Sequence, residues 1–411
     1  MLRLFYIGIL GVIFSILTSL FNLSFEISLI GIGVFSFVML GLYLFDLMNF
    51  DVPKYSVKNY LNVIGINMVF FFIWFFISWD FWLIIFFILF TSITILIRAV
   101  INMFVYRIKP VTIYGDGELK INLEKSLEKL EGYKYINFKE NIDELEEFVK
   151  INNIKLLLLG KIKLEEKEIE KILKIKLRNT HVMSYLDYML EIEKKVEVSY
   201  INEEWLLNAY GFEILRSKFQ NKVKRVFDIG MSIVIGTLTF PVMIIAAIIV
   251  RLESPGPIIY SQERVGENEK EFMVYKFRSM RQDAEKDGAK WAQKNDPRVT
   301  KFGNFMRKTR IDELPQLLNV IRGDMSFIGP RPERMVFIKE LEKQIPYYGL
   351  RHMVKPGLTG WAQVMYPYGA TVEDAKNKLE YDLYYIKCYS LYLDIVILFK
   401  TLKTVVFGKG R

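Results

Sequence analysis

The sequence has very few residues suited to sulfur or imidazole chemistry. Among its 411 residues, Cys388 is the only cysteine, and His181 and His352 are the only histidines. One cysteine excludes an intrachain disulfide framework and a cysteine-ligated metal site. Two histidines supply little for zinc chemistry or for a Ser-His-Asp triad, so each is expected to be structural or to contact a substrate.

The chain also lacks the motifs that bind RNA or DNA. Its lysines mostly alternate with glutamates, a pattern that is typical of a solvated surface. The formal net charge of +9 favours anionic partners such as phosphates and membrane lipids. We therefore expect no nucleic acid partner.

Long apolar runs dominate the first quarter of the chain, and 52% of all residues are apolar. The runs occupy residues 4–21, 27–45, 61–79 and 82–105. Each is about long enough to cross a hydrocarbon core of roughly 30 Å. They carry almost no polar stripe, unlike an amphipathic core helix. Because no small-residue cleavage site is evident, we interpret the first run as a span and not as a removed signal peptide.

Cations gather on one side of these four runs. The segments before the first run, between the second and third, and after the fourth carry Arg3, Lys54, Lys58, Arg107 and Lys109. The loops at 22–26 and 80–81 carry none. The positive-inside rule then predicts a four-helix transmembrane region over residues 1–106 with both of its ends in the cytoplasm.

Residues 107–195 change to a soluble composition in which strand and helix patterns alternate. Apolar stretches at 111–114, 133–138 and 156–159 predict strands. Asn141, with Glu144 three residues later, predicts a capped helix between the last two. Its inner face is expected to carry Ile142, Leu145 and Val149. The alternation predicts a small α/β Rossmann-like domain with a parallel sheet.

A glycine turn follows the first predicted strand of this domain. Gly115 and Gly117 occupy the first two glycine positions of a dinucleotide-binding loop, but Lys120 takes the third. Such a fragment is a weak signal. A structural or regulatory role is therefore preferred to cofactor binding, and the sequence does not show which ligand, if any, the domain binds.

A fifth apolar run lies beyond a connector at residues 196–221 that has no readable motif. Residues 229–250 are long enough to span a membrane as one straight helix of about 33 Å. Cations flank both of its ends, which disfavours a crossing. Pro241 in its middle breaks the hydrogen-bond ladder. We therefore predict a re-entrant membrane helix over residues 224–250 that breaks at Pro241 and returns to the same side.

Two adjacent acids near the C-terminal third lie between a run of cations and a proline. Arg307-Lys308-Thr309-Arg310 precede Asp312 and Glu313, and Pro315 follows. Proline is tolerated in the first turn of a helix, so the acids are expected at a helix N-terminus, where the dipole favours negative charge. Further on, Pro330 and Pro332 stiffen a loop around Arg331, whose guanidinium suits phosphate. Capping is the ordinary role of such acids, but acids beside arginines also suit phosphoryl transfer.

The motifs from residue 222 onward resemble, in order, those of the monotopic phosphoglycosyl transferases, also called bacterial sugar transferases. They are residues 224–228 (KRVFD), 254–257 (SPGP), 262–266 (QERVG), 276–280 (KFRSM), 312–316 (DELPQ), 323–326 (GDMS), 329–332 (GPRP) and 356–361 (PGLTGW). The resemblance covers residues 222–411. The membrane and α/β segments in front of it are similar to those of the longer members of this family.

The resemblance implies transfer of a sugar 1-phosphate from a UDP-sugar to undecaprenyl phosphate, with release of UMP and a covalent aspartyl-phosphosugar intermediate. It implies that Asp312 is the nucleophile and Glu313 a ligand of Mg²⁺. It also implies that Arg307 and Arg331 bind phosphate. It further implies that Lys276 and Arg278, in the polar wall of the site, bind substrate phosphate. Arg264, Asp324 and Gln363 also belong to its motifs, and a fold-holding role is at least as open for each of them.

The resemblance further implies the cytoplasmic membrane of a bacterium, with the active site on the cytoplasmic face. It places the reaction at the first membrane step of surface glycan assembly, and a homodimer is allowed. A non-catalytic scaffold for glycan assembly or export is the alternative. A transporter is disfavoured because the first three runs are nearly free of ionisable residues away from their ends. No motif encodes the sugar.

The C-terminal segment carries two further apolar patterns. Residues 384–386 and 389–407 have the pattern of amphipathic helices that lie on a membrane interface, with Lys387, Lys400 and Lys403 toward the headgroups. A core helix is the alternative. Residues 222–411 are thus predicted to form a mainly α-helical catalytic domain with a re-entrant helix and interfacial helices.

Overall fold

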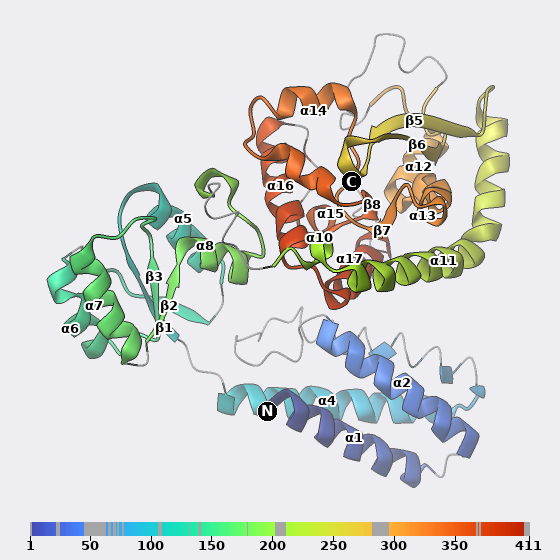
Figure 1. Ribbon diagram of the computed structural model, residues 1–411. Coiled ribbons are helices and arrows are strands. Elements are labelled where there is room, and N and C mark those ends of the chain that lie inside the picture. Colours follow the sequence, from blue (N-terminus) through green and yellow to red (C-terminus); the bar gives the residue numbers. More distant parts are fainter. Residues whose placement is uncertain are drawn as a thin grey trace. The chain divides into compact units, whose positions relative to one another are not determined.

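The computed structural model divides the chain into two compact units, Met1–Tyr185 and Leu186–Arg411. The structure describes residues 2–21, 25–44, 63–64, 67–68, 71, 74–75, 78–105, 109–130, 132–138, 141–178, 180–201, 211–281, 296–366, 369 and 371–406. Figure 1 shows the described elements. The fold is mostly helical, with one four-stranded parallel sheet in the first unit, as expected from the sequence.

The apolar runs of the first unit form helices. They are α1 (Leu2–Leu20), α2 (Phe25–Leu44) and α4 (Trp82–Val105). Aromatic side chains fill the space between them, and Trp74 packs so closely on Gly31 that a Cβ at Gly31 would lie 2.6 Å from the indole. Asn67 donates a buried hydrogen bond to Thr91 at 3.3 Å. Small residues and polar bonds of this kind are typical of helices packed within a membrane.

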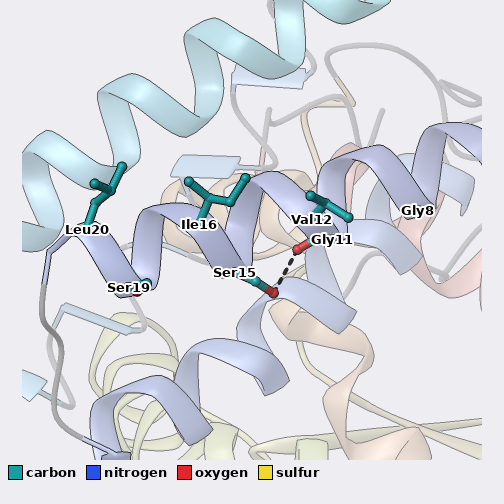
Figure 2. A pocket seen from close by; sticks show the side chains of 7 residues that line it. All are labelled: Gly8, Gly11, Val12, Ser15, Ile16, Ser19 and Leu20. Atoms are coloured by element: carbon teal, nitrogen blue, oxygen red, sulfur yellow. Dashed lines mark hydrogen bonds between the residues drawn. The ribbon is translucent and has the colours of Figure 1, made fainter.

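The four-span prediction falls partly outside the described residues, because most of the run at 61–79 is not described. By length and composition, two helices of the described part can cross a membrane, Trp82–Ile101 and Lys218–Glu253. Tyr6–Leu20 is a shorter apolar helix. A shallow hollow runs along α1 (Figure 2), lined by Gly8, Gly11, Val12, Ser15, Ile16, Ser19 and Leu20. The count of four spans and their orientation stay predictions.

The second part of the first unit alternates strands and helices. In chain order it comprises β1 (Lys109–Tyr114), α5 (Gly117–Glu128), β2 (Tyr133–Tyr135), α6 (Ile142–Ile151), β3 (Leu156–Leu159), α7 (Glu166–Leu177) and β4 (His181–Ser184), and the short α8 (Tyr185–Tyr188) begins at the unit's last residue. The strands pair in parallel in the order β2-β1-β3-β4. The three predicted strands are present, although the second ends at Tyr135 and not at residue 138, and β4 was not predicted. Asn141 caps α6 as expected, and Leu145 and Val149 are buried.

Gly115 is explained by close packing within this sheet. Its φ is +138°, and a Cβ there would lie 2.7 Å from the backbone of Gly160. Only glycine combines that backbone conformation with such a close approach. The contact favours the structural role of the glycine turn.

The second unit begins with short turns and then a long helix. The elements are α10 (Glu213–Arg216), α11 (Lys218–Glu253), β5 (Ile259–Val265), β6 (Glu271–Phe277), α12 (Lys301–Thr309), α13 (Leu317–Arg322), β7 (Ser326–Ile328), α14 (Met335–Leu341), β8 (Gly357–Thr359), α15 (Trp361–Met365), α16 (Val372–Lys387) and α17 (Leu391–Val406). β5 and β6 form an antiparallel hairpin, and β7 pairs with β8 in parallel. Helical turns at Ile311–Gln316 and Tyr348–Met353 are of the tighter 3₁₀ type.

The helix α11 is longer than predicted and is continuous through Pro241. It runs over 36 residues with Pro241 inside it, and Figure 1 shows it bending sharply. The Thr239 hydroxyl donates to the Ile235 carbonyl at 2.7 Å, a bond that also bends helices. Leu238 and Phe240 expose their side chains beside the proline. An exposed apolar surface on a bent helix suits a membrane segment, while its re-entrant path stays a prediction.

The N-terminal part of α11 is fastened to the rest of the unit by buried polar groups. Lys224 forms an ion pair with Asp394 of α17 at 2.9 Å. Asp228 accepts a hydrogen bond from Ser326 of β7 at 2.7 Å. The motif at 224–228 therefore holds the helix against α17 and β7.

The interfacial interpretation of residues 384–386 is wrong, because α16 is a core helix. Tyr384, Tyr385 and Ile386 are all buried. The Tyr385 hydroxyl donates to Asp394 at 2.8 Å. The aromatic side chains that suggested an interface are covered by other elements of the same unit, as the alternative interpretation held. In α17, by contrast, Tyr392 and Leu402 remain exposed.

Candidate active site

A left-handed residue ends α12 and starts the turn that carries the two acids. Arg310 has a φ of +60°, and the 3₁₀ turn Ile311–Gln316 follows it directly. Asp312 and Glu313 lie in the first part of this turn, and the regular α-helix begins only at Leu317. The predicted helix start is right, but its first turn is 3₁₀ and Pro315 lies within it. Both acids are buried, although acids at a helix start are usually solvated.

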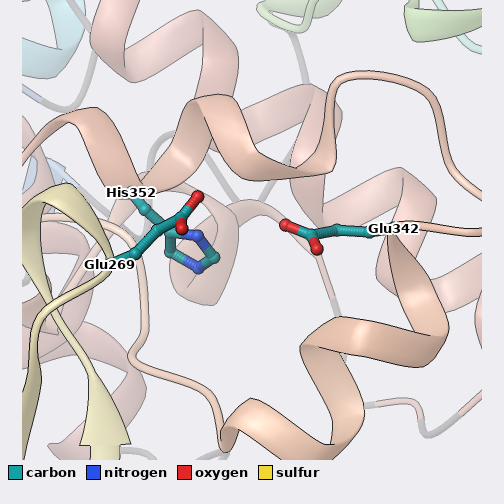
Figure 3. A group of neighbouring side chains, drawn as sticks. All are labelled: Glu269, Glu342 and His352. Atoms are coloured by element: carbon teal, nitrogen blue, oxygen red, sulfur yellow. The ribbon is translucent and has the colours of Figure 1, made fainter.

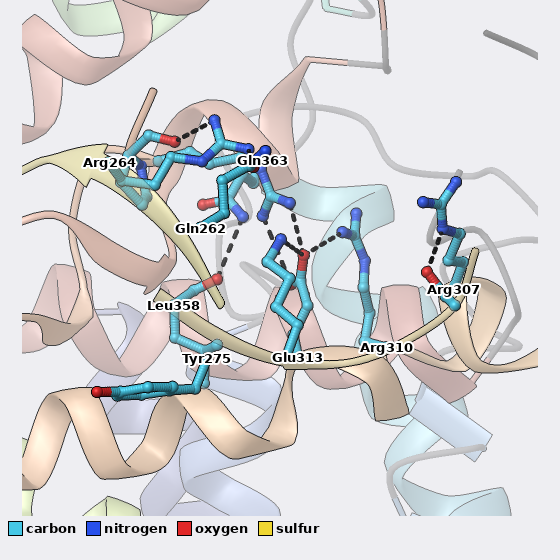
Figure 4. Close-up of polar contacts among 12 residues, drawn as sticks. Gln262, Arg264, Tyr275, Arg307, Arg310, Glu313, Leu358 and Gln363 are labelled. Atoms are coloured by element: carbon cyan, nitrogen blue, oxygen red, sulfur yellow. Dashed lines mark hydrogen bonds and ion pairs between the residues drawn. The ribbon is translucent and has the colours of Figure 1, made fainter. Parts of the chain in front are cut away.

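Glu313 accepts contacts from three cations that come from three different segments. Nη2 of Arg331 lies 2.5 Å from Oε1, and Nη1 of Arg331 lies 3.5 Å from Oε2. Nη1 of Arg310 lies 3.4 Å and Nζ of Lys276 lies 3.5 Å from Oε1. Figure 4 shows Arg310 reaching this carboxylate. Burial raises the pKa of Glu313, but Arg331, Arg310 and Lys276 outweigh it and hold that pKa well below its usual range.

Asp312 has the opposite environment although it is the preceding residue. Its Oδ1 is buried and has no hydrogen-bond partner among the described residues. Burial and the neighbouring charge of Glu313 raise the pKa of Asp312, against the opposing effect of Lys276, Arg307 and Arg310. A carboxylate oxygen with a raised pKa and no hydrogen bond is more basic and more nucleophilic when ionised.

Lys276 and Arg307 both lie close enough to Asp312 for their charges to oppose the rise of its pKa. Lys276 projects from β6, where burial, with repulsion by Arg331 and Arg264, lowers its pKa to about 8 despite the attraction of Glu313. Arg307 lies on the last turn of α12, and its Nε donates to the Ser279 hydroxyl at 2.9 Å. The structure therefore brings Lys276 and Arg331 onto the Glu313 carboxylate and holds Arg307 on Ser279. Figure 4 shows Arg307 beside Arg310.

Arg278 is placed elsewhere, at the C-terminal end of α11. Its guanidinium donates to the carbonyls of Ser254 at 2.6 Å and Pro255 at 2.9 Å, and to the Ser254 hydroxyl at 3.0 Å. These groups end the long helix and start the segment that leads to β5. The hydrogen bonds of Arg278 thus connect the end of α11 to the hairpin of β5 and β6. They do not go to Asp312 or Glu313.

Arg264 supports the backbone around Arg331. It donates to Gln262 at 2.8 Å and to the Pro332 carbonyl at 3.4 Å, and its Nη1 lies 3.5 Å from Glu333.

Asp324 and Gln363 hold other backbone segments. Asp324 lies 3.5 Å from the amide of Asn319, and that amide donates to the Met273 carbonyl at 2.7 Å. Gln363 donates to the Leu358 carbonyl at 3.3 Å. These hydrogen bonds are those of fold-holding residues.

Two supporting residues were missed from the sequence. Arg351 donates to the backbone carbonyl of Arg331 at 2.9 Å and pairs with Asp382 at 2.8 Å, which fixes the Arg331 loop. The side-chain oxygen of Asn319 accepts a hydrogen bond from the backbone N–H of Tyr275 at 3.2 Å. This bond positions the strand that carries Lys276. Neither lies in a motif that indicates its partner. Arg310 was part of the cation run, and its i,i+3 spacing from Glu313 was the signal for their contact.

The acid pair fits a magnesium ion that is bound together with phosphates. Proteins usually hold Mg²⁺ through one or two carboxylates and the substrate's own phosphate oxygens. Oδ1 of Asp312 is a buried oxygen with no partner among the described residues, and the neighbouring Glu313 has two further oxygens. Phosphates that attract Arg331, Arg310 and Lys276 would leave Glu313 available to the ion.

The C-terminal part of the chain matches a known protein family. Residues 219–408 match the family model described as bacterial sugar transferase. The chain is 45% identical over 216 residues, 53% of this chain and 50% of the relative, to a UDP-N-acetylgalactosamine-undecaprenyl-phosphate N-acetylgalactosaminephosphotransferase of Aeromonas hydrophila. It is 55% identical over 129 residues, 31% of this chain and 72% of the relative, to a putative undecaprenyl-phosphate N-acetylgalactosaminyl 1-phosphate transferase of Bacillus subtilis (strain 168).

A third relative names a different sugar. The chain is 45% identical over 181 residues to a UDP-glucose:undecaprenyl-phosphate glucose-1-phosphate transferase of Escherichia coli (strain K12). That match covers 44% of this chain and 39% of the relative. The chain thus matches about half or less of the length of the Aeromonas and Escherichia proteins.

Proposed function

Because the chain belongs to the bacterial sugar transferase family, we propose that it transfers a sugar 1-phosphate from a UDP-sugar to undecaprenyl phosphate and releases UMP. The names of the relatives support the two substrate classes. The observation that carries the proposal is the buried acid pair, in which three cations surround Glu313 and one oxygen of Asp312 has no hydrogen-bond partner among the described residues.

Asp312 acts as the nucleophile in a two-step reaction. Its carboxylate oxygen attacks the phosphorus that bears the sugar, the bond from that phosphorus to the bridging oxygen breaks, and UMP leaves with that oxygen. An oxygen of undecaprenyl phosphate then attacks the same phosphorus. The bond to Asp312 breaks, the carboxylate is restored, and a sugar diphosphate lipid is formed. Covalent catalysis divides the joining of two anions into two easier steps.

The cations around Glu313 prepare the site for phosphate. Arg331 offers a planar pair of donors, which matches phosphate oxygens. Lys276 and Arg310 add positive charge in a buried place, where charge interactions are stronger than in water. In the absence of substrate, Glu313 pairs with all three and keeps them in position, which limits the reorganisation needed when the diphosphate arrives.

Magnesium is the expected cofactor, with Glu313 as a ligand and Asp312 beside it. When bound, it would neutralise charge on the phosphate oxygens. Arg307 is expected to bind phosphate from the α12 side. Arg278 is expected to act on the structure of α11 and not on the phosphates, because its hydrogen bonds go to Ser254 and Pro255.

The membrane location is proposed from the apolar helices. The exposed apolar side chains of α11 favour insertion into the bilayer, and the bend at Pro241 favours a re-entrant path. In that arrangement the acids face the cytoplasm at the headgroup level, where a cytosolic nucleotide sugar and a lipid phosphate can meet. The reaction then begins the assembly of a surface glycan on its lipid carrier.

An assay of UMP formation tests the proposal. Purified protein in detergent receives Mg²⁺, undecaprenyl phosphate and either UDP-N-acetylgalactosamine or UDP-glucose, since the relatives differ in the sugar that their names give. We expect UMP release that requires the lipid for multiple turnovers and is lost in Asp312→Asn. If no UDP-sugar of a broad panel yields UMP, the chain is not this enzyme and a scaffold role is favoured.

A further inference from the structure

A second group of ligating side chains lies in the second unit on elements that carry none of the proposed catalytic residues. Glu269 belongs to the turn between β5 and β6, Glu342 follows directly after α14, and His352 lies in the 3₁₀ turn Tyr348–Met353. One ligating atom from each lies within 4.8 Å of the others. Figure 3 shows the His352 imidazole beside the Glu269 carboxylate, with the Glu342 carboxylate reaching toward both.

The imidazole provides an independent observation. The His352 residue is only 7% exposed, and its Nδ1 is buried without a hydrogen-bond partner among the described residues. A buried ring nitrogen is usually satisfied by a donor, an acceptor or a metal ion. The Glu269 and Glu342 carboxylates beside it are exposed and can supply oxygen ligands.

We propose that Glu269, Glu342 and His352 bind one divalent transition-metal ion of the zinc type. One nitrogen and two carboxylate oxygens suit zinc better than magnesium or calcium, which prefer oxygen ligands alone. Two carboxylates and a neutral imidazole also balance the charge of a dication.

The geometry allows the site to close with small side-chain movements. Ligand bonds of about 2.0–2.2 Å place tetrahedral ligand atoms about 3.4 Å apart. The atoms here lie within 4.8 Å, and both glutamates are exposed, so their side chains can rotate inward while His352 stays in place. A water molecule would complete four-coordination.

The ion would fasten two segments that support the active site. Glu269 ends the hairpin turn whose second strand carries Lys276. His352 follows Arg351, which donates to the Arg331 carbonyl at 2.9 Å. A metal bridge between the turn and His352 would thus restrict the two elements that position Lys276 and Arg331. This is a structural role, because the cations that contact Glu313 are Arg331, Arg310 and Lys276 and the three ligands lie on other elements.

Cobalt substitution in the full-length protein tests the site. The protein is purified in detergent without a polyhistidine tag, stripped with a chelator and titrated with Co²⁺ in excess Mg²⁺, which occupies sites made of oxygen ligands alone. We expect one Co²⁺ per chain with visible ligand-field absorption, which is displaced by Zn²⁺. His352→Gln should abolish that absorption, and Glu342→Gln should weaken binding at least about tenfold.

Matched variants separate this site from the acid pair and from surface carboxylates. Glu340→Gln removes an exposed carboxylate two residues before Glu342, and Glu313→Gln alters the active site; both should keep the Co²⁺ absorption. The proposal is wrong if the wild type shows no such absorption, or if His352→Gln binds Co²⁺ as the wild type does. Should His352→Gln fail to fold, unchanged affinity in both Glu269→Gln and Glu342→Gln would equally overturn it.

Discussion

Asp312 and Glu313 are consecutive residues of one buried turn, yet their carboxylates meet opposite surroundings. Oε1 of Glu313 accepts a hydrogen bond from Nη2 of Arg331 at 2.5 Å. Oδ1 of Asp312, by contrast, has no hydrogen-bond partner among the described residues. The difference arises because adjacent residues of a helical turn point in different directions. One acid can thereby hold cations while the other keeps an oxygen available for an electrophile. This division of roles is the centre of the proposed mechanism.

Arg278 and Lys276 are two residues apart, and we expect their substitutions to fail in different ways. Arg278→Gln removes several buried hydrogen bonds from a charged group, which costs about 3–5 kcal/mol of folding free energy. Its apparent Tm should fall clearly, while the KM for UDP-sugar of the folded fraction stays close to that of the wild type. Lys276→Gln should instead lower kcat/KM at least about tenfold with a smaller change in Tm.

The control for this pair is Arg281→Gln, which removes an exposed arginine that donates to the Pro297 carbonyl. It should resemble the wild type in thermal unfolding and in UMP release. If Arg278→Gln keeps its Tm but loses donor binding, Arg278 is a phosphate ligand, as the motif resemblance implied.

Two carboxylates of α16 should give pH dependences of opposite sign. Burial raises the pKa of Asp382 to about 6 despite Arg351 and Lys378. The folded state therefore keeps a proton that the unfolded state releases, and this contribution to stability falls as pH rises from about 4 to about 6. The Thr371 hydroxyl and backbone N–H lower the pKa of Asp374, so its contribution is present at neutral pH and lost on acidification.

Thermal unfolding of Asp382→Asn between about pH 4 and pH 7, and of Asp374→Asn below about pH 4, measures this contrast. Relative to the wild type, Asp382→Asn should gain stability as pH rises from about 4 to about 6, whereas Asp374→Asn should lose stability as pH rises toward about 4. Parallel curves for wild type and Asp382→Asn would show that the Asp382 carboxyl is not perturbed by burial.

Residues 186–216 should be needed for the stability of the second unit. Lys195 pairs with the buried Glu380 at 2.7 Å, and the Trp361 ring N–H donates to the Lys194 carbonyl at 2.9 Å. A truncated chain that starts at Leu186 should keep UMP release in detergent. One that starts at Ser217 leaves Glu380 buried without Lys195, so it should unfold at a clearly lower temperature. If the truncated chain that starts at Leu186 binds the donor but does not transfer the sugar phosphate, the first unit contributes to the site.

The path of α11 can be tested by labelling single cysteines in oriented membranes. After Cys388→Ser removes the native thiol, Lys222→Cys and Lys270→Cys place exposed thiols on either side of the apolar stretch. We expect an impermeant reagent to label both from the cytoplasmic side, because Pro241 bends the helix and cations flank both ends. Labelling from opposite sides would mean that α11 spans the membrane.

Local patterns predicted the elements that depend on neighbouring residues. Asn141 caps α6 because its side chain reaches the N–H of Asp143, a contact within one turn. The strand at 156–159 followed from four consecutive leucines that are buried in a parallel sheet. The turn at Asp312 and Glu313 was located by the proline behind it, although its 3₁₀ form depends on the left-handed Arg310.

What the sequence did not predict depends on tertiary contacts. Periodicity shows that Tyr384, Tyr385 and Ile386 are apolar but not whether lipid or protein covers them. An arginine such as Arg278 donates to any carbonyl within reach, so its motif position does not identify its partners. Arg351 and Asn319 support the site through backbone groups far along the chain, at separations of 20 and 44 residues.

The most direct test of the mechanism is intact-mass analysis of the protein with UDP-sugar and Mg²⁺ but no lipid acceptor. We expect an adduct with the mass of one sugar phosphate in the wild type, released on addition of undecaprenyl phosphate, and absent in Asp312→Asn. Glu313→Gln should form it more slowly and only at higher Mg²⁺. An adduct that persists in Asp312→Asn, or sequential kinetics with no adduct under any condition, would contradict Asp312 as the nucleophile.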